Sequence, residues 1–101
     1  VLLNIFAFGM TPQDAVEQPR FASFSYPRSS NPNPYSPGLM NLEGRFPEAT
    51  VAKLRALGHD VALWPDWDSA AGAVCAILHD QKAGTMEGGS DPRRPTAVAG
   101  W

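Results

Sequence analysis

The chain has 101 residues, a formal net charge of -2 at pH 7 and a pI near 5.5. This length suits one small domain, and we expect residues 1–101 to form a single fragment without a dividing linker. The weak negative charge provides no basic surface, so we expect neither nucleic acid nor a membrane as a partner. No apolar run approaches the roughly 20 residues of a transmembrane helix, and the opening residues lack the features of a signal peptide. The sequence therefore assigns no compartment.

The first residues, 1–8, are apolar and begin without a helix cap or a polar lead-in. Such a start is typical of a helix that has been cut in its interior. We therefore expect the chain to be a fragment of a longer protein. Gly9 should end this first helix in a positive-φ conformation.

A second short helix should follow, with Thr11 as its N-cap and Pro12 at its first position. Ala15 and Val16 should form its buried side. Aromatic residues then alternate with small or polar ones over residues 20–24, which predicts an edge strand.

Residues 25–38 are rich in proline, serine and asparagine and should form a long loop, because proline excludes both helix and strand ladder. A loop of this length is either a wall or lid of a site, or a mobile excursion. Tyr26, Arg28 and Tyr35 could contact an aromatic or carboxylate ligand. They could equally hold the loop against its own domain.

Residues 39–43 and 59–64 predict two strands on either side of the clearest helix in the chain. This helix should begin at Pro47 and end at Gly58 as a left-handed cap. It should cover the sheet with three apolar side chains at helical spacing: Val51, Leu54 and Leu57.

The apolar run at residues 72–80 predicts the central strand of the chain, buried on both faces. We therefore expect Ile77 to pack in the core and Cys75 to be a buried structural thiol, not a reactive one. A turn at residues 80–84 should reverse the chain into a hairpin strand at residues 85–87.

The candidate chemistry is sparse, and no catalytic constellation can be assembled from the residues present. His59 and His79 lack partner ligands at metal-binding spacing, so we expect no metal site. Asp66 and Asp68 are more typical of turn caps than of a paired acid and base. Residues 88–90 lack the strand-to-helix context of a phosphate loop, and their glycines should instead permit a tight backbone reversal.

The segment 91–95 is more specific. Two adjacent arginines, Arg93 and Arg94, stand between prolines and cannot lie in a helix. Asp91 beside them suggests a charge-assisted network that ties the end of the chain to its body. At least one guanidinium should therefore turn inward while the other stays in water.

Four segments, taken in order, resemble the C-terminal part of the small subunit of γ-glutamyltransferases: Ala15–Phe21, Leu57–Val61, Gly89–Arg94 and Ala99–Trp101. The resemblance implies an α+β chain that is the C-terminal portion of an αββα N-terminal-nucleophile hydrolase fold, with a mainly antiparallel sheet and covering helices. It also points to Arg93 as the inward-facing arginine. The residues to which it assigns structural roles are Arg20, Asp91, Arg93 and Arg94.

In that family the precursor cuts itself, and the new N-terminal threonine of the small subunit attacks the amide carbonyl of a γ-glutamyl group. The resemblance implies a small-molecule amide substrate, such as glutathione or a related small acid amide, and no metal or organic cofactor. It also implies a partner, the remainder of the same precursor, which comprises the large subunit and the N-terminal part of the small subunit.

The family's nucleophile, carboxylate-binding groups and oxyanion loop cannot be mapped onto this sequence, and Val1 has no hydroxyl or thiol. The chain should therefore supply scaffold and be inactive by itself, with no catalytic residue of its own. Trp101, where Tyr is common, and the Pro-rich 25–38 loop resemble the acylase and oxamate amidohydrolase branch. The alternative is a stand-alone α+β binding domain whose loop holds a partner.

Overall fold

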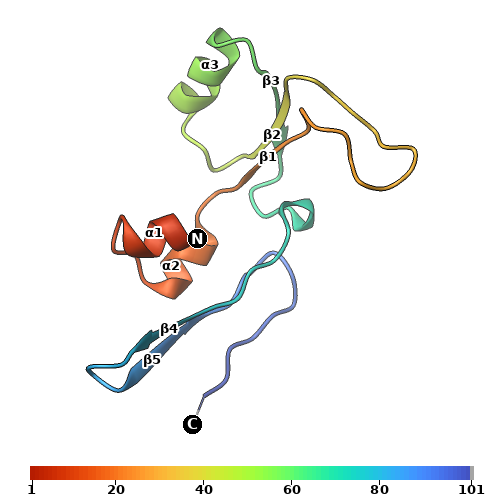
Figure 1. The fold of residues 1–101 in the computed structure, drawn as a ribbon. Coiled ribbons are helices and arrows are strands. Elements are labelled where there is room, and N and C mark those ends of the chain that lie inside the picture. Colours follow the sequence, from red (N-terminus) through yellow and green to blue (C-terminus); the bar gives the residue numbers. More distant parts are fainter. Residues whose placement is uncertain (101) are drawn as a thin grey trace. The chain divides into compact units, whose positions relative to one another are not determined.

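A computed structural model describes residues 1–100 (Figure 1). The chain divides into two compact units, which are described separately: unit 1 contains Val1–Gln18 and the residues from Gly72 onward, and unit 2 contains Pro19–Ala71. The expectation of a single domain stays a prediction. Trp101 lies outside the described residues. Among the described residues, no helix has the length and apolar character needed to cross a membrane.

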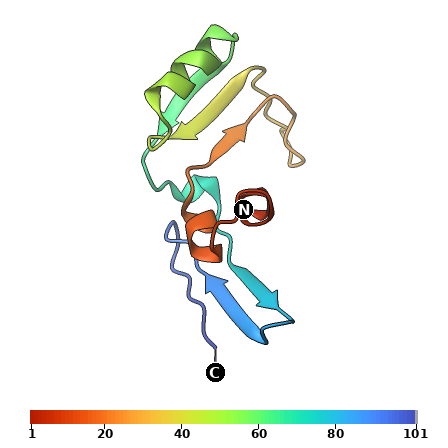
Figure 2. The ribbon, with the colours of Figure 1, turned by 90° about the vertical axis from the view of Figure 1, so that its left-hand side faces the viewer.

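Unit 2 is built on a three-stranded sheet of β1 (Phe21–Ser23), β2 (Leu39–Glu43) and β3 (Asp60–Trp64), in that order. β1 pairs antiparallel with β2, and β2 pairs parallel with β3. A parallel pair requires a crossover connection, which α3 (Glu48–Ala56) provides (Figure 2). The predicted edge strand and the strand–helix–strand segment are confirmed, and α3 starts one residue later than expected.

The core of unit 2 lies between α3 and one face of this sheet. Leu42, Val51 and Val61 are buried there. Met40, Phe46 and Leu54 pack partly against them. The prediction for Leu57 is wrong: the helix has already ended, and Leu57 is its C-cap with 70% of its surface exposed.

Residues 25–38 form the predicted loop, which leaves the sheet between β1 and β2 (Figure 1). Its base is held by the backbone, because the Ser36 N–H donates to the carbonyl of Phe24 at 3.1 Å. Tyr26 and Tyr35 are exposed. The Arg28 guanidinium lies 5.4 Å from the centre of the Phe24 ring.

Unit 1 contains α1 (Leu2–Phe6) and α2 (Pro12–Glu17). Gly9 follows α1 with φ +66°, in the conformation predicted for it. The predicted start of α2 is confirmed, since Thr11 Oγ1 accepts a hydrogen bond from the Asp14 N–H at 3.1 Å. Ala15 and Val16 are buried, as expected.

Unit 1 also contains a hairpin of β4 (Ala76–Asp80) and β5 (Thr85–Gly89), which pair with each other and with no other strand of the described residues. The hairpin is confirmed, with Gly84 at φ +67° in its turn. The burial predicted for this stretch is wrong, because Ile77 is 67% exposed and Cys75 is exposed. An apolar run indicates a strand that is buried in the folded protein. In this structure other residues cover only part of the strand.

The glycines of β5 also differ from the prediction, because they lie in the strand and not in a backbone reversal. A Cβ on Gly89 would lie 2.5 Å from the carbonyl carbon and oxygen of Pro12. A Cβ on Gly88 would collide with the Val98 side chain. Gly89 therefore permits the close approach of α2 to one side of β5. Gly88 permits the close approach of Val98 to the other side. These last residues, 90–100, form the tail, which turns back along the hairpin (Figures 1 and 2).

Candidate functional site

The tail begins with a buried carboxylate. Asp91 is 1% exposed, and its Oδ2 accepts the Val74 N–H at 2.9 Å. Its Oδ1 accepts the backbone N–H of Arg93 at 3.0 Å, the local turn that aspartate makes with the residue two positions later. The Thr96 hydroxyl donates to the Asp91 carbonyl at 2.7 Å. One residue thus joins the tail to the segment that precedes β4.

The Arg93 side chain is buried beside this carboxylate. Its Nη1 donates to Asp91 Oδ1 at 3.1 Å and to the Val16 carbonyl at 3.0 Å. Its Nη2 donates to the Gln18 carbonyl at 2.9 Å. These carbonyls close the C-terminal end of α2, where a helix leaves its last C=O groups without partners and carries partial negative charge. The guanidinium therefore caps α2 from the tail.

A second link joins the same helix to the same tail. The Ser90 N–H donates to Gln13 Oε1 at 2.9 Å, and Gln13 Nε2 donates to the Ser90 carbonyl at 3.1 Å. Gln13 Nε2 also donates to Glu17 Oε1 at 2.6 Å. The Gln13 amide thus both accepts from and donates to the backbone of Ser90, as a residue of a neighbouring strand would. This pair of hydrogen bonds fixes the position of the tail along α2.

The pattern that defines the gamma-glutamyltranspeptidase family matches residues 1–101. The chain belongs to the gamma-glutamyltranspeptidase family. The family predicted from the sequence motifs is confirmed.

Two curated relatives are proenzymes. The oxamate amidohydrolase proenzyme of Klebsiella pneumoniae is 36% identical over 94 residues, covering 92% of this chain and 16% of that protein. The glutathione hydrolase-like YwrD proenzyme of Bacillus subtilis is 35% identical over 100 residues, covering 99% of this chain and 18% of that protein. The chain thus spans about a sixth of the length of these relatives.

Solved structures show the same fold. A cephalosporin acylase from Bacillus halodurans matches with a TM-score of 0.80 and 27% identity, over 99% of this chain and 16% of that one. A gamma-glutamyltranspeptidase from Pseudomonas nitroreducens, complexed with L-DON, matches with a TM-score of 0.69 and 20% identity, over 99% of this chain and 46% of that one. The predicted α+β fold class, a portion of the N-terminal-nucleophile hydrolase fold, is confirmed.

Within this gamma-glutamyltranspeptidase-family chain, the four predicted structural residues lie in two places. Asp91 and Arg93 form the buried cluster, and Arg94 beside them is exposed. Arg20 belongs to unit 2, where its N–H donates to Glu43 Oε2 at 2.8 Å and its carbonyl accepts the Glu43 N–H at 3.0 Å. The inward orientation of Arg93 is as expected; the structural roles of the four residues stay predictions.

Sequence reasoning missed Glu43, whose side chain is fully buried at the end of β2. Its carboxylate accepts the Arg20 N–H, the Asp68 N–H at 3.3 Å and Arg45 Nη2 at 3.3 Å. The Arg45 guanidinium in turn lies 3.5 Å from the centre of the Trp67 ring. The overlooked signal is an acidic residue two positions before an arginine, the same spacing as in Asp91 and Arg93.

The other candidate residues are engaged in local structure. Asp68 Oδ1 accepts the Ala70 N–H at 2.7 Å, which is the predicted turn cap. His59 is half-buried and His79 is exposed. Over residues 1–100, no group of three or more His, Cys, Asp or Glu side chains could hold a metal ion. Both buried carboxylates are bonded to backbone N–H groups and an arginine, an arrangement suited to holding segments together.

Proposed function

We propose that this chain is the scaffold that supports the end of the small subunit in a self-processing amide hydrolase of the gamma-glutamyltranspeptidase family. The observation that carries the proposal is the burial of Asp91 and Arg93. Their hydrogen bonds run to Val74, Val16 and Gln18, which lie in two other segments of unit 1. Side chains occupied in this way hold segments together and do not reach out to a substrate.

The substrate we propose is a small acid that carries an amide. The names of the two proenzyme relatives refer to oxamate and to glutathione, and both compounds fit this description. In the proposed mechanism the remainder of the precursor supplies an N-terminal threonine. Its α-amine takes the hydroxyl proton while the oxygen attacks the amide carbon. The C–N bond then breaks, and the amine leaves with that proton. Water later hydrolyses the acyl ester, which releases the acid and restores the threonine hydroxyl. No residue of the present chain takes part in those steps.

The isolated chain should therefore be inactive, because the loss of an oxyanion donor alone costs about 100- to 1,000-fold in rate. The test compares the pure 101-residue chain with the full-length precursor, using oxamate and γ-glutamyl-p-nitroanilide as substrates. We expect hydrolysis of at least one substrate by the precursor after self-cleavage, and of neither by the chain. Turnover by the chain alone would refute the scaffold role. A processed precursor that hydrolyses neither compound would refute the substrate class.

A further inference from the structure

The hairpin of unit 1 has two faces with different surroundings. Ala76 pairs with Gly89 on the face that packs on α2, where Gly89 lies against Pro12. Ile77 pairs with Gly88 on the opposite face, because successive residues of a strand point to opposite sides. Both β4 and β5 also leave an edge of the two-stranded sheet without a strand partner within the described residues.

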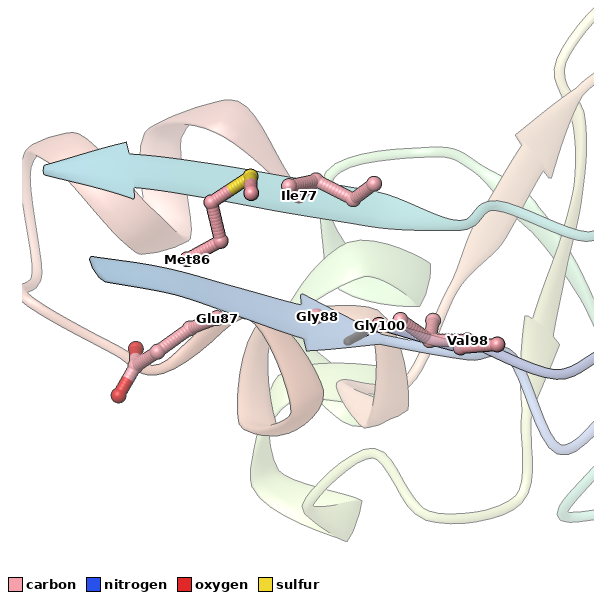
Figure 3. A pocket seen from close by; sticks show the side chains of 7 residues that line it. Ile77, Met86, Glu87, Gly88, Val98 and Gly100 are labelled. Carbon is pink, nitrogen blue, oxygen red and sulfur yellow. The ribbon is translucent and has the colours of Figure 1, made fainter. Parts of the chain in front are cut away.

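The face opposite α2 carries Ile77, Met86 and the tail residue Val98, and we refer to these three residues as the hairpin face (Figure 3). They are 67%, 71% and 40% exposed. They border a hollow of about 270 Å³, whose floor at Gly88 is bare backbone. The Glu87 side chain points away from the hollow (Figure 3).

The exposed side chains of the hairpin face are apolar, whereas a surface in contact with water normally carries polar side chains. An antiparallel sheet with one solvated face normally places polar side chains on it, and a two-stranded hairpin alone is marginally stable. His79 lies on the same side of the hairpin as these three residues, pairs with Met86 near the turn and is exposed. The aliphatic surface thus lies away from the turn, around Ile77.

The same imbalance extends to the whole chain. Among the described residues the buried hydrophobic core contains five residues, whereas fourteen large hydrophobic residues are exposed. A domain of this size depends on burying most of the apolar surface that it has. The chain therefore presents more surface suited to burial than its own elements cover.

We propose that the hairpin face is a docking surface for the remainder of the same precursor, which would cover Ile77, Met86 and Val98 with aliphatic side chains. This inference rests on the proposed function, in which such a remainder exists. Two proenzyme relatives extend far beyond the region that matches, since this chain spans 16% and 18% of their lengths. A predominantly apolar contact is also typical of permanent interfaces, in contrast to transient ones.

Methionine oxidation tests the proposal without a substitution. The full-length precursor is treated with dilute hydrogen peroxide, native and in urea, and sulfoxide formation is followed by peptide mass spectrometry. We expect native Met86 to be protected as strongly as Met40, which packs against the core of unit 2. Oxidation of native Met86 at its rate in urea, with Met40 still protected, would overturn the proposal. Protection that disappears on dilution to the monomer would assign the cover to a second copy and would also overturn it.

A matched pair of variants gives an independent test. Met86→Lys places a charge on the hairpin face, whereas Gln81→Lys places the same charge in the exposed hairpin turn. We expect a loss of soluble, self-cleaved precursor for Met86→Lys and none for Gln81→Lys. Equal yields of the two variants would contradict the docking surface. Hydrolysis is measured separately, so a precursor that protects Met86 but cleaves no amide refutes the proposed function alone.

Discussion

Asp91 in unit 1 and Glu43 in unit 2 make the same kinds of contact. Each carboxylate is buried, accepts a backbone N–H from a segment distant in sequence, and pairs with an arginine two residues later. For Asp91 the distant segment contains Val74. Glu43 binds two such segments, at Arg20 and at Asp68. In each unit one acidic side chain thus links segments that are far apart in the sequence.

Arg93 and Arg45 differ in burial, and this difference determines how much free energy is lost when either cluster is broken. The side chain of Arg93 is 0% exposed and that of Arg45 is 23% exposed. A buried pair that loses one partner leaves an uncompensated charge, which costs several kcal/mol, whereas water can solvate part of an exposed one. The Asp91 cluster should therefore tolerate substitution less well than the Glu43 cluster.

Arg93→Ala should produce the largest effect. It removes the side-chain hydrogen bonds to Asp91 and to the carbonyls of Val16 and Gln18, and it takes the Arg93 cation away from the buried carboxylate. We expect a local destabilisation of roughly 3–5 kcal/mol. The destabilisation is measured in the full-length precursor by hydrogen exchange of the peptides that contain α2 and Val74. The melting temperature and the extent of self-cleavage are measured alongside.

Arg94→Ala is the matched control, because Arg94 is the exposed neighbour and a surface charge contributes about 1 kcal/mol or less. Equal exchange in the two variants would show that burial does not distinguish these arginines. A precursor with Arg93→Ala that matures and melts as wild type but has a raised Michaelis constant would show that Arg93 binds substrate.

Glu43→Gln should have the next largest effect. The amide keeps the shape of the side chain but loses the charge that binds Arg45 and retains one acceptor oxygen for the Arg20 and Asp68 N–H groups. Hydrogen bonds to a charged group are worth about 1.5–3 kcal/mol, so we expect a loss of that order in unit 2. Hydrogen exchange in β1 and β2 reports it. Glu48→Gln, at the exposed start of α3, is the control; if it exchanges as fast as Glu43→Gln, the buried cluster contributes no more than a surface charge.

The elements of unit 2 were predictable because their signals are local. β2 has the predicted bounds, and Gly58 takes the predicted positive φ, +92°, after α3. The Glu43 cluster was not predictable in the same way. It depends on the turn near Asp68 returning to the end of β2, a contact that no local pattern encodes. The prolines around Arg93 and Arg94 excluded a helix and predicted only that one of the two guanidinium groups turns inward. Arg93 was chosen because its position matches the family's Asp-Pro-Arg.

For the hairpin, the secondary structure was predictable from the sequence and the burial was not. The turn residues predicted the reversal at Gly84. The apolar run predicted a central strand over residues 72–80, whereas β4 begins at Ala76 and belongs to a two-stranded sheet. Burial, however, is a property of what surrounds a strand, and the sequence around Ile77 carries no information about its neighbours in space. The same limit applies to Gly89, whose close approach to Pro12 was mistaken for a turn.

Gly89→Ala and Gly44→Ala compare a glycine two residues before Asp91 with the glycine directly after Glu43. A Cβ on Gly89 would meet backbone atoms of Pro12 and Gln13 at 2.5 to 2.7 Å, so α2 must move away. A Cβ on Gly44 would instead first meet Asp66 Oδ1 at 2.5 Å, the end of a side chain that can rotate. We expect a destabilisation of about 1–3 kcal/mol for Gly89→Ala and less for Gly44→Ala. Hydrogen exchange in α2 and β3 measures each, and a larger loss for Gly44→Ala would reverse the order inferred here.

Arg45→Ala should give the smallest effect of the series, and it removes the stacking on Trp67 together with the partly exposed ion pair to Glu43. Arg45 lies 3.5 Å from the centre of the Trp67 ring, and its Nε donates to the Asp66 carbonyl at 2.9 Å. A cation over an aromatic ring at a partly exposed site is worth about 0.5–1 kcal/mol. We therefore expect a small increase in hydrogen exchange around the 65–68 turn, together with a change in Trp67 fluorescence. Arg28→Ala, which removes a longer stacking contact of 5.4 Å on Phe24, is the control and should change neither. An Arg45→Ala loss as large as that of Glu43→Gln would mean that the arginine, and not the backbone N–H groups, is the main partner of the buried carboxylate.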